Sequence, residues 1–93
     1  MNMVMNAVLL NIEGEGLASS LQEWGDNLTG VEGDVVLDLS SVRRVDPADL
    51  TALTAFADQA AAKSVKVELR GVGIDVYRVL KLARVAKRFS RVS

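Results

Sequence analysis

The chain contains one sharply defined helix start, at Asp46-Pro47-Ala48-Asp49-Leu50. Asp46 suits the N-cap position, where a carboxylate accepts a hydrogen bond from a free backbone N–H of the first turn. Pro47 suits the first helical position, where its missing N–H costs nothing, and Asp49 stands three residues after the cap, as in a capping box. The apolar stretch 35–39 and a short turn precede this start. A strand followed by such a helix start exposes the N-terminal end of the helix, where function often concentrates.

Hydrophobic periodicity divides the chain into alternating strands and helices. The segments expected as strands are 3–12 (with a break near Asn6), 35–39, 65–69 and a short last one at 89–92, and those expected as helices are 17–28, 47–63 and 75–87. This alternation predicts a small α/β layer, with helices packed on a central, mostly parallel sheet of about four strands. At 93 residues the chain is expected to form one domain, 1–93.

The pattern of each segment also predicts its place in the fold. Segment 35–39 is apolar on both faces except at Asp38, which predicts an interior strand. Segment 65–69 alternates apolar with charged residues, which predicts a strand nearer an edge. The helix residues expected to point inward are Leu17, Leu21, Trp24 and Leu28, then Leu50, Leu53, Phe56, Ala57 and Ala60, and finally Val76, Tyr77, Leu80 and Ala83. Trp24 is expected in the core, with a partner anchor as the alternative.

Cysteine and histidine are both absent from the sequence. Their absence excludes disulfides, zinc–thiolate sites and a thiol nucleophile, and it removes the commonest general base and metal ligand. We therefore expect no enzyme and no cofactor. The N-terminus has no basic region before its apolar stretch, and no segment approaches the ~20 apolar residues of a membrane helix. A cytoplasmic protein without membrane insertion is expected.

Charges are segregated along the chain. Residues 1–62 hold ten acidic and two basic residues, whereas residues 63–93 hold nine basic and two acidic ones. One interpretation is a solvated, Lys/Arg-rich C-terminal helix, and the other is a basic face for an acidic protein or for lipid headgroups. Nucleic acid is not an expected partner, because the basic stretch lacks interleaved aromatic residues and the sequence pI is about 5.3.

Three carboxylates, Asp38, Asp46 and Asp49, gather where the second expected strand leads into the long helix. Together they could hold a divalent cation. The simpler interpretation assigns Asp46 and Asp49 to the helix cap and Asp38 to a local hydrogen bond, so we expect no metal site. Gly71-Val72-Gly73 begins like a dinucleotide loop but has Val76 in place of the third glycine, and a turn is expected there.

The stretch from Val35 to Asp46, V-V-L-D-L-S-S-V-R-R-V-D, resembles the core motif of the STAS family, the sulfate-transporter and anti-sigma-antagonist domain. Three further segments are similar to the family's flanking elements: Ile12–Leu17, Val65–Gly73 and Val76–Leu82. The resemblance covers roughly residues 7–90. It implies a SpoIIAA-like fold that docks protein partners and is not an enzyme.

In the anti-sigma factor antagonists of this family, a partner kinase phosphorylates a serine at the helix start, and the phosphate blocks binding. A phosphate adds ~1.5–2 negative charges to the docking face. Here the family's two serines align with Pro47 and Ala48, and its glycine with Asp49. Neither Pro47 nor Ala48 can accept a phosphate, so the chain resembles a compact variant that lacks the phosphorylatable serine. Ser40, Ser41 and Thr51 are the alternative phosphate acceptors.

The resemblance implies a non-catalytic, regulatory protein–protein interaction module of bacteria. Its expected partner-binding residues are Asp46, Pro47, Ala48, Asp49, Leu50 and Thr51. The partner would be an anti-sigma kinase-like protein. The alternative is a small STAS subunit of a bacterial phospholipid ABC transporter, which would bind the ATPase subunit. A nucleotide- or lipid-sensing binding domain is a third hypothesis for the function. A second copy of this chain is a further possible partner, in a homodimer.

Overall fold

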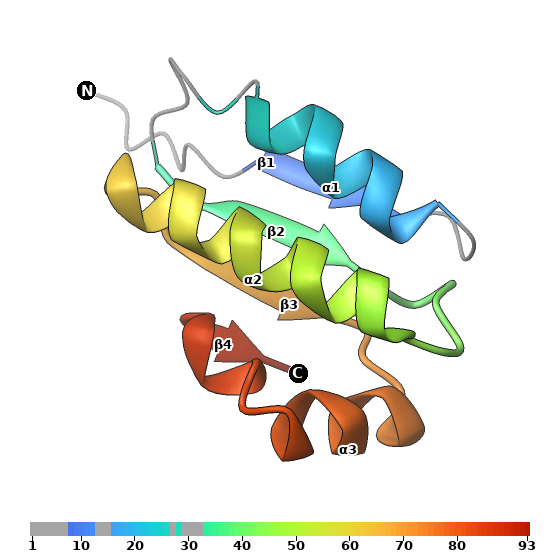
Figure 1. Ribbon diagram of the computed structural model, residues 1–93. Coiled ribbons are helices and arrows are strands. Elements are labelled where there is room, and N and C mark those ends of the chain that lie inside the picture. The colour runs from blue at the N-terminus through green and yellow to red at the C-terminus, as the bar shows by residue number, and fades with distance from the viewer. Residues whose placement is uncertain (1–7, 13–15, 27, 29–32) are drawn as a thin grey trace.

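A computed structural model describes residues 8–12, 16–26, 28 and 33–93 of the chain (Figure 1). Four strands form one sheet in the order in which they occur along the chain, and every neighbouring pair is parallel. They are β1 (Val8–Asn11), β2 (Val35–Asp38), β3 (Val67–Arg70) and β4 (Arg91–Val92). This confirms the expected α/β fold with a parallel sheet of four strands. The part of the expected first strand before Val8, with its break near Asn6, lies outside the described residues.

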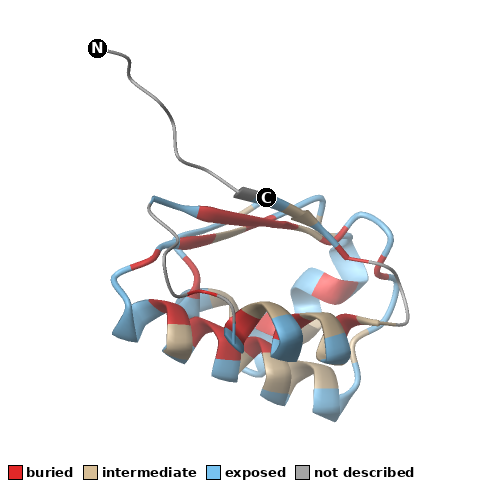
Figure 2. Cartoon of the chain, turned by 90° about the horizontal axis from the view of Figure 1, so that it is seen from above, coloured by how far each residue is buried: buried red, intermediate tan, exposed pale blue. Residues whose placement is uncertain are grey.

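The helices α1 (Leu17–Asp26), α2 (Pro47–Ala62) and α3 (Ile74–Leu82) connect successive strands, and a short 3₁₀ helix, η1 (Ala86–Arg88), precedes β4. All of them lie on the same face of the sheet, so the fold has two layers (Figures 1 and 2). Parallel strands taken in sequence order with crossovers of one hand place their helices on one face.

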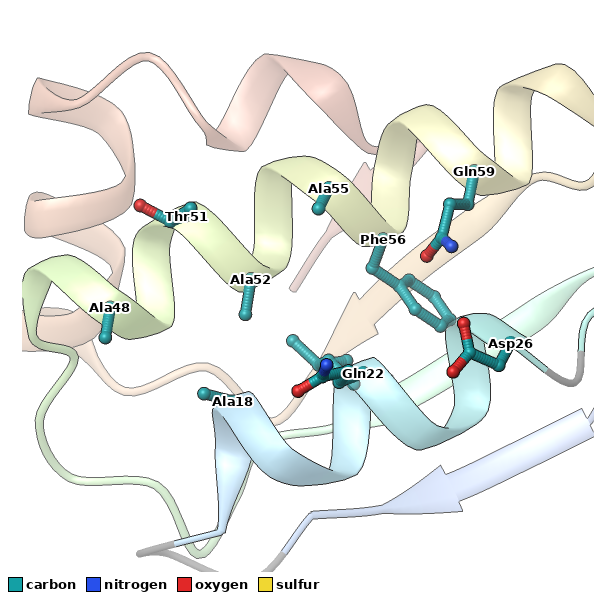
Figure 3. A pocket seen from close by; sticks show the side chains of 10 residues that line it. Ala18, Gln22, Asp26, Ala48, Thr51, Ala52, Ala55, Phe56 and Gln59 are labelled. Carbon is teal, nitrogen blue, oxygen red and sulfur yellow. The ribbon is translucent and has the colours of Figure 1, made fainter.

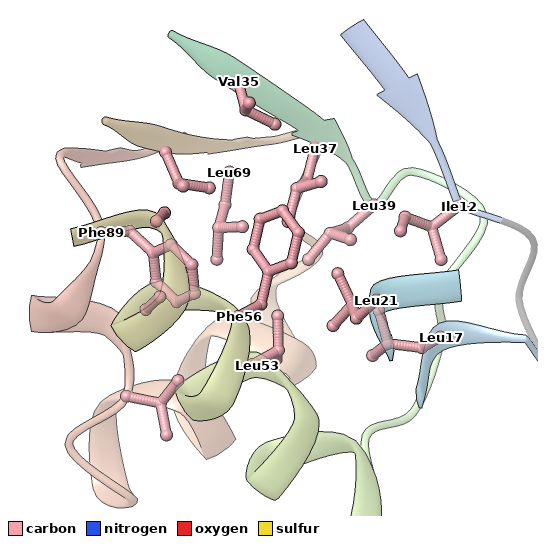
Figure 4. Packing of buried hydrophobic residues seen from close by; sticks show 14 of the residues in the cluster. Ile12, Leu17, Leu21, Val35, Leu37, Leu39, Leu53, Phe56, Leu69 and Phe89 are labelled. Carbon is pink, nitrogen blue, oxygen red and sulfur yellow. The ribbon is translucent and has the colours of Figure 1, made fainter. Parts of the chain in front are cut away.

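The core lies between the sheet and its helices, with α2 at its centre (Figure 4). The register aligns Leu10, Leu37 and Leu69 across neighbouring strands, and Leu37 and Leu69 are fully buried. From α2, Leu53 and Phe56 pack against this row and are fully buried as well. The inward stripe expected for this helix is thus confirmed for Leu53, Phe56, Ala57 and Ala60, whereas Leu50 is only half-buried. Trp24 is half-buried and packs against the core cluster.

β3 is not itself an edge strand, because it pairs with β2 on one side and with the short edge strand β4 on the other. Val67 and Leu69 point toward the helices and are buried, while Glu68 and Arg70 alternate with them on the opposite face. Those two side chains form an ion pair at 3.6 Å on that face. The alternation therefore reflects a sheet covered by helices on one face rather than an edge position.

α3 ends at Leu82, earlier than expected. Arg84 takes a left-handed backbone conformation (φ 61°), and the N–H of Val85 donates to the carbonyl of Leu80 at 2.8 Å, as in a Schellman cap. This turn brings Val85 into the core. The expected inward positions of Tyr77 and Ala83 were wrong, since both residues are exposed.

Candidate functional site

A complete capping box closes the N-terminal end of α2. The backbone N–H of Asp49 donates to the Asp46 carboxylate at 2.9 Å, and the backbone N–H of Asp46 donates to the Asp49 carboxylate at 3.1 Å. Pro47 occupies the first helical position and has no N–H to satisfy. The N–H of Leu50 donates to the carbonyl of Asp46 at 3.0 Å. This helix start is therefore fixed by its own side chains.

The side chains expected to bind a partner differ in exposure. Asp46, Pro47, Ala48 and Thr51 are exposed, whereas Asp49 and Leu50 are half-buried. The hydroxyl of Thr51 donates to the carbonyl of Pro47 at 3.1 Å. Thr51 is thus an accessible hydroxyl on α2, but its hydrogen is engaged with the helix backbone.

A shallow hollow of about 410 Å³ lies between α1 and α2, beside this helix start (Figure 3). Ala48 and Thr51 line one end of it, and the other lining residues are Ala18, Leu21, Gln22, Asp26, Ala52, Ala55, Phe56 and Gln59. Figure 3 shows Ala48 and Ala52 pointing from α2 toward α1, on which Ala18 lies. Small side chains on both helices keep the hollow open.

The sequence prediction missed the α1 side of this hollow. On α2 the sequence does contain a signal for the hollow. Its small residues Ala48, Ala52 and Ala55 follow helical spacing and form a stripe next to the core-facing stripe. On α1, nothing in the sequence indicates which residues lie opposite that stripe. Packing of the two helices side by side determines that Ala18 and Gln22 line the hollow.

The turn between β2 and α2 packs closely against Gly71 in the turn after β3. The backbone N–H of Ser40 donates to the Asp38 carboxylate at 2.9 Å. Gly71 lies so close to this turn that a Cβ atom on it would be 3.0 Å from the Asp38 carboxylate and 3.2 Å from the Ser40 nitrogen. Hydrogen bonds from the backbone and hydroxyl of Ser40, aided by the charge of Arg70, lower the pKa of Asp38 below its ordinary value. The ionised Asp38 thus holds this turn at the carboxyl end of the sheet.

Ser40 and Ser41 are both exposed in this turn. Ser40 lines a second hollow, of about 350 Å³, together with Gly71, Gly73 and the start of α3. The structure therefore places Ser40 against the β3–α3 turn, while Thr51 lines the hollow between α1 and α2.

The three carboxylates considered for a cation have separate hydrogen-bond partners. Asp46 and Asp49 bind each other's backbone, and Asp38 accepts from Ser40. Among the residues that the structure describes, no group of three potential metal ligands gathers. In the same part of the chain, no helix is long and apolar enough to cross a membrane.

Comparison with known proteins places this geometry in a family. The family model described as "Mlab, STAS domain" matches residues 2–91. No curated protein sequence matches the chain.

The solved structures that share the fold include three that illustrate the likeness. A sulfate transporter family protein from Wolinella succinogenes superposes with a TM-score of 0.84 at 17% identity, over 99% of this chain and 80% of that one. The SulP transporter STAS domain from Vibrio cholerae gives 0.85 at 14% identity, over 99% and 77% of the two chains. A putative anti-sigma factor antagonist from Thermotoga maritima gives 0.75 at 21% identity, over 99% and 83%. At these identities the likeness concerns the fold.

Proposed function

The chain belongs to the STAS domain family, and from that premise we propose that it is a non-catalytic docking module that stays bound to its protein partner. The docking surface comprises the start of α2, with Pro47, Ala48 and Thr51 exposed, and the adjoining hollow between α1 and α2. Small side chains along this surface allow the backbone of a partner segment to approach closely.

The capping box supports a docking surface that phosphorylation does not switch. Pro47 and Ala48 have no hydroxyl, and the Asp46 and Asp49 carboxylates already occupy the N-terminal end of the helix. A phosphate added there would meet two negative charges instead of free backbone N–H groups. Binding at this surface therefore depends on shape and fixed charge.

A module that stays bound to its partner suits a subunit of a permanent complex better than a regulator that phosphorylation releases. We infer that the partner is the ATPase subunit of an ABC transporter, for which this chain would be a small STAS subunit. An anti-sigma kinase-like protein is the second candidate, favoured by the exposed Thr51 as a remaining phosphate acceptor. A nucleotide- or lipid-sensing role has less support, because buried side chains such as Leu37 and Phe56 fill the space between the sheet and α2.

The docking surface can be tested with bulky substitutions that leave the capping box intact. Ala48→Arg and Thr51→Arg would each fill the end of the hollow, and both positions are exposed, so the fold should survive. Ala62→Arg is the matched control, because Ala62 is exposed at the far end of the same helix. Each protein serves as bait in host lysate, and the retained proteins are identified by mass spectrometry.

We expect the wild type and Ala62→Arg to retain the same ATPase subunit, and Ala48→Arg and Thr51→Arg to lose it. If the wild type retains an anti-sigma kinase-like protein and Ala48→Arg and Thr51→Arg lose it, the docking surface is supported and the proposed partner is wrong. Equal retention by all four baits would contradict the proposed surface. Phosphorylation of Ser40, Ser41 or Thr51 that releases the partner would contradict continuous binding.

A further inference from the structure

Exposed apolar side chains concentrate on α3. Of the four large hydrophobic residues that the described part of the chain exposes, three belong to this nine-residue helix. Leu82 is 86% exposed, Ile74 71% and Tyr77 38%. Single exposed apolar residues are ordinary on protein surfaces, whereas apolar side chains gathered on one surface point to an interaction.

Cationic side chains are interleaved with these apolar ones. Ile74, Arg78 and Leu82 follow one another at intervals of four residues, and Tyr77 and Lys81 are also four apart, so all five face the same side of the helix. The Lys81 ammonium lies 5.8 Å from the centre of the Tyr77 ring, within the range of a cation–π contact. The exposed face of α3, defined by these five residues, is both apolar and basic.

The surroundings of this face add positive charge. Arg84 and Lys87 follow α3 and are exposed. Arg88 is engaged elsewhere, in an ion pair with Asp58 of α2. Asp75 is the single carboxylate within α3. Negative charge is therefore the complement of this surface.

The exposed face of α3 is turned away from the core. α3 lies at the margin of the helical layer, with α2 between it and α1 (Figure 1). Val76 and Leu80, on its opposite side, are buried and hold it against the core. Protein partners usually bind an amphipathic helix in a groove, whereas a helix whose exposed face is both apolar and basic is of the type that lies in the plane of a membrane surface.

We propose that the exposed face of α3 adsorbs to the surface of a bilayer that contains anionic phospholipids. Ile74, Leu82 and the ring of Tyr77 enter the boundary between headgroups and acyl chains, where amphipathic helices rest. Arg78 and Lys81 reach the lipid phosphates beside them. The contact uses side chains that the fold leaves exposed, so it needs no unfolding of α3.

Vesicle binding tests this directly. The purified chain is sedimented with vesicles of phosphatidylcholine alone and with vesicles that also contain phosphatidylglycerol, at low and at high salt. One variant combines Arg78→Gln with Lys81→Gln, and a second combines Ile74→Gln with Leu82→Gln. The charge-matched control combines Lys63→Gln with Lys66→Gln, near the amino end of β3 and away from the start of α3. Thermal unfolding of each variant checks that the fold is intact.

We expect the wild type to bind only the anionic vesicles and to be released by high salt. Removing both cations should lower the partition coefficient about thirty-fold, roughly fivefold for each charge. Removing both aliphatic side chains should lower it by about tenfold or more, and the lysine control should bind within about twofold of the wild type.

Three outcomes would overturn the proposal. The first is no binding of the folded wild type to anionic vesicles at low salt. The second is an equal loss in the lysine control, because general charge attraction would then explain the binding. The third is that a synthetic acidic amphipathic peptide binds the α3 face while vesicles do not, which would identify an acidic protein segment as the occupant.

Discussion

Asp46 and Asp49 hold each other's backbone N–H groups through their carboxylates, at 2.9 and 3.1 Å, and so close the N-terminal end of α2. Replacing Asp46 by alanine removes one of the two bonds and leaves the Asp49 N–H without its side-chain acceptor. We expect Asp46→Ala to lower the free energy of unfolding by about 1 kcal/mol. Urea denaturation followed by circular dichroism measures the change.

The matched control for this prediction is Asp46→Asn. Asparagine caps a helix about as well as aspartate, so most of the lost stability should return, apart from a few tenths of a kcal/mol for the charge at the helix end. If alanine and asparagine destabilise the protein equally, the charge of Asp46 matters and its hydrogen bond does not.

Gly71 occupies a position that admits no side chain. Its φ is +72°, and a Cβ would lie 3.0 Å from both the Asp38 carboxylate and the Ser40 Cβ. Gly71→Ala should therefore cost about 1–3 kcal/mol of stability, from backbone strain together with displacement of the Ser40 turn. The control is Gly73→Ala, because that glycine has φ −70° and open space around its Cβ position. A thermal melt in which the two variants lose equal stability would contradict this account.

The start of α2 could be predicted because its signals are local. Asp46, Pro47 and Asp49 each have a chemistry that suits one helix position, and the structure puts all three there. The role of this helix start in partner binding stays a prediction, because geometry alone does not identify a partner. The parallel α/β layer followed similarly from the alternation of strand and helix patterns, whereas the order of the strands in the sheet emerged only from the structure.

The end of α3 could not be predicted, because its cause is not local. Arg84 takes the left-handed conformation that glycine usually provides, so its residue type gave no signal. The turn instead directs the chain back toward the core, where Val85 and Phe89 are both buried. The α1 side of the hollow was unpredictable for the same kind of reason, because Ala18 and Ala52 are far apart in sequence.

The carboxylate of Asp38 should give the fold a particular response to acid. Its pKa in the folded state lies below the ordinary value of 3.8, mainly because Ser40 donates hydrogen bonds to the ionised form. The unfolded chain therefore takes up this proton at a higher pH than the folded one. The contribution of Asp38 is fully present above its unfolded pKa and is lost as the pH falls through the lower folded pKa.

The measurement is thermal unfolding of the wild type and Asp38→Asn from neutral pH down to strongly acidic pH. The difference in stability between the two proteins should be constant above about pH 5 and shrink below about pH 4. Titration of the Asp38 carboxyl carbon by NMR tests the cause directly. A midpoint at or above 3.8 would be incompatible with the Ser40 hydrogen bonds.

Leu53 points from α2 into the middle of the core and is fully buried, next to the equally buried Phe56 (Figure 4). Leu53→Ala should lower the free energy of unfolding by about 2–5 kcal/mol, because it removes buried methyl groups and leaves a cavity that a close-packed core fills only in part. The same change at Leu82, which is 86% exposed, is the matched control and should cost less than about 0.5 kcal/mol. Urea denaturation of both variants gives the comparison. A small, equal loss at the two positions would mean that α2 does not pack on the sheet through Leu53, and the docking surface proposed on the same helix would lose its structural support.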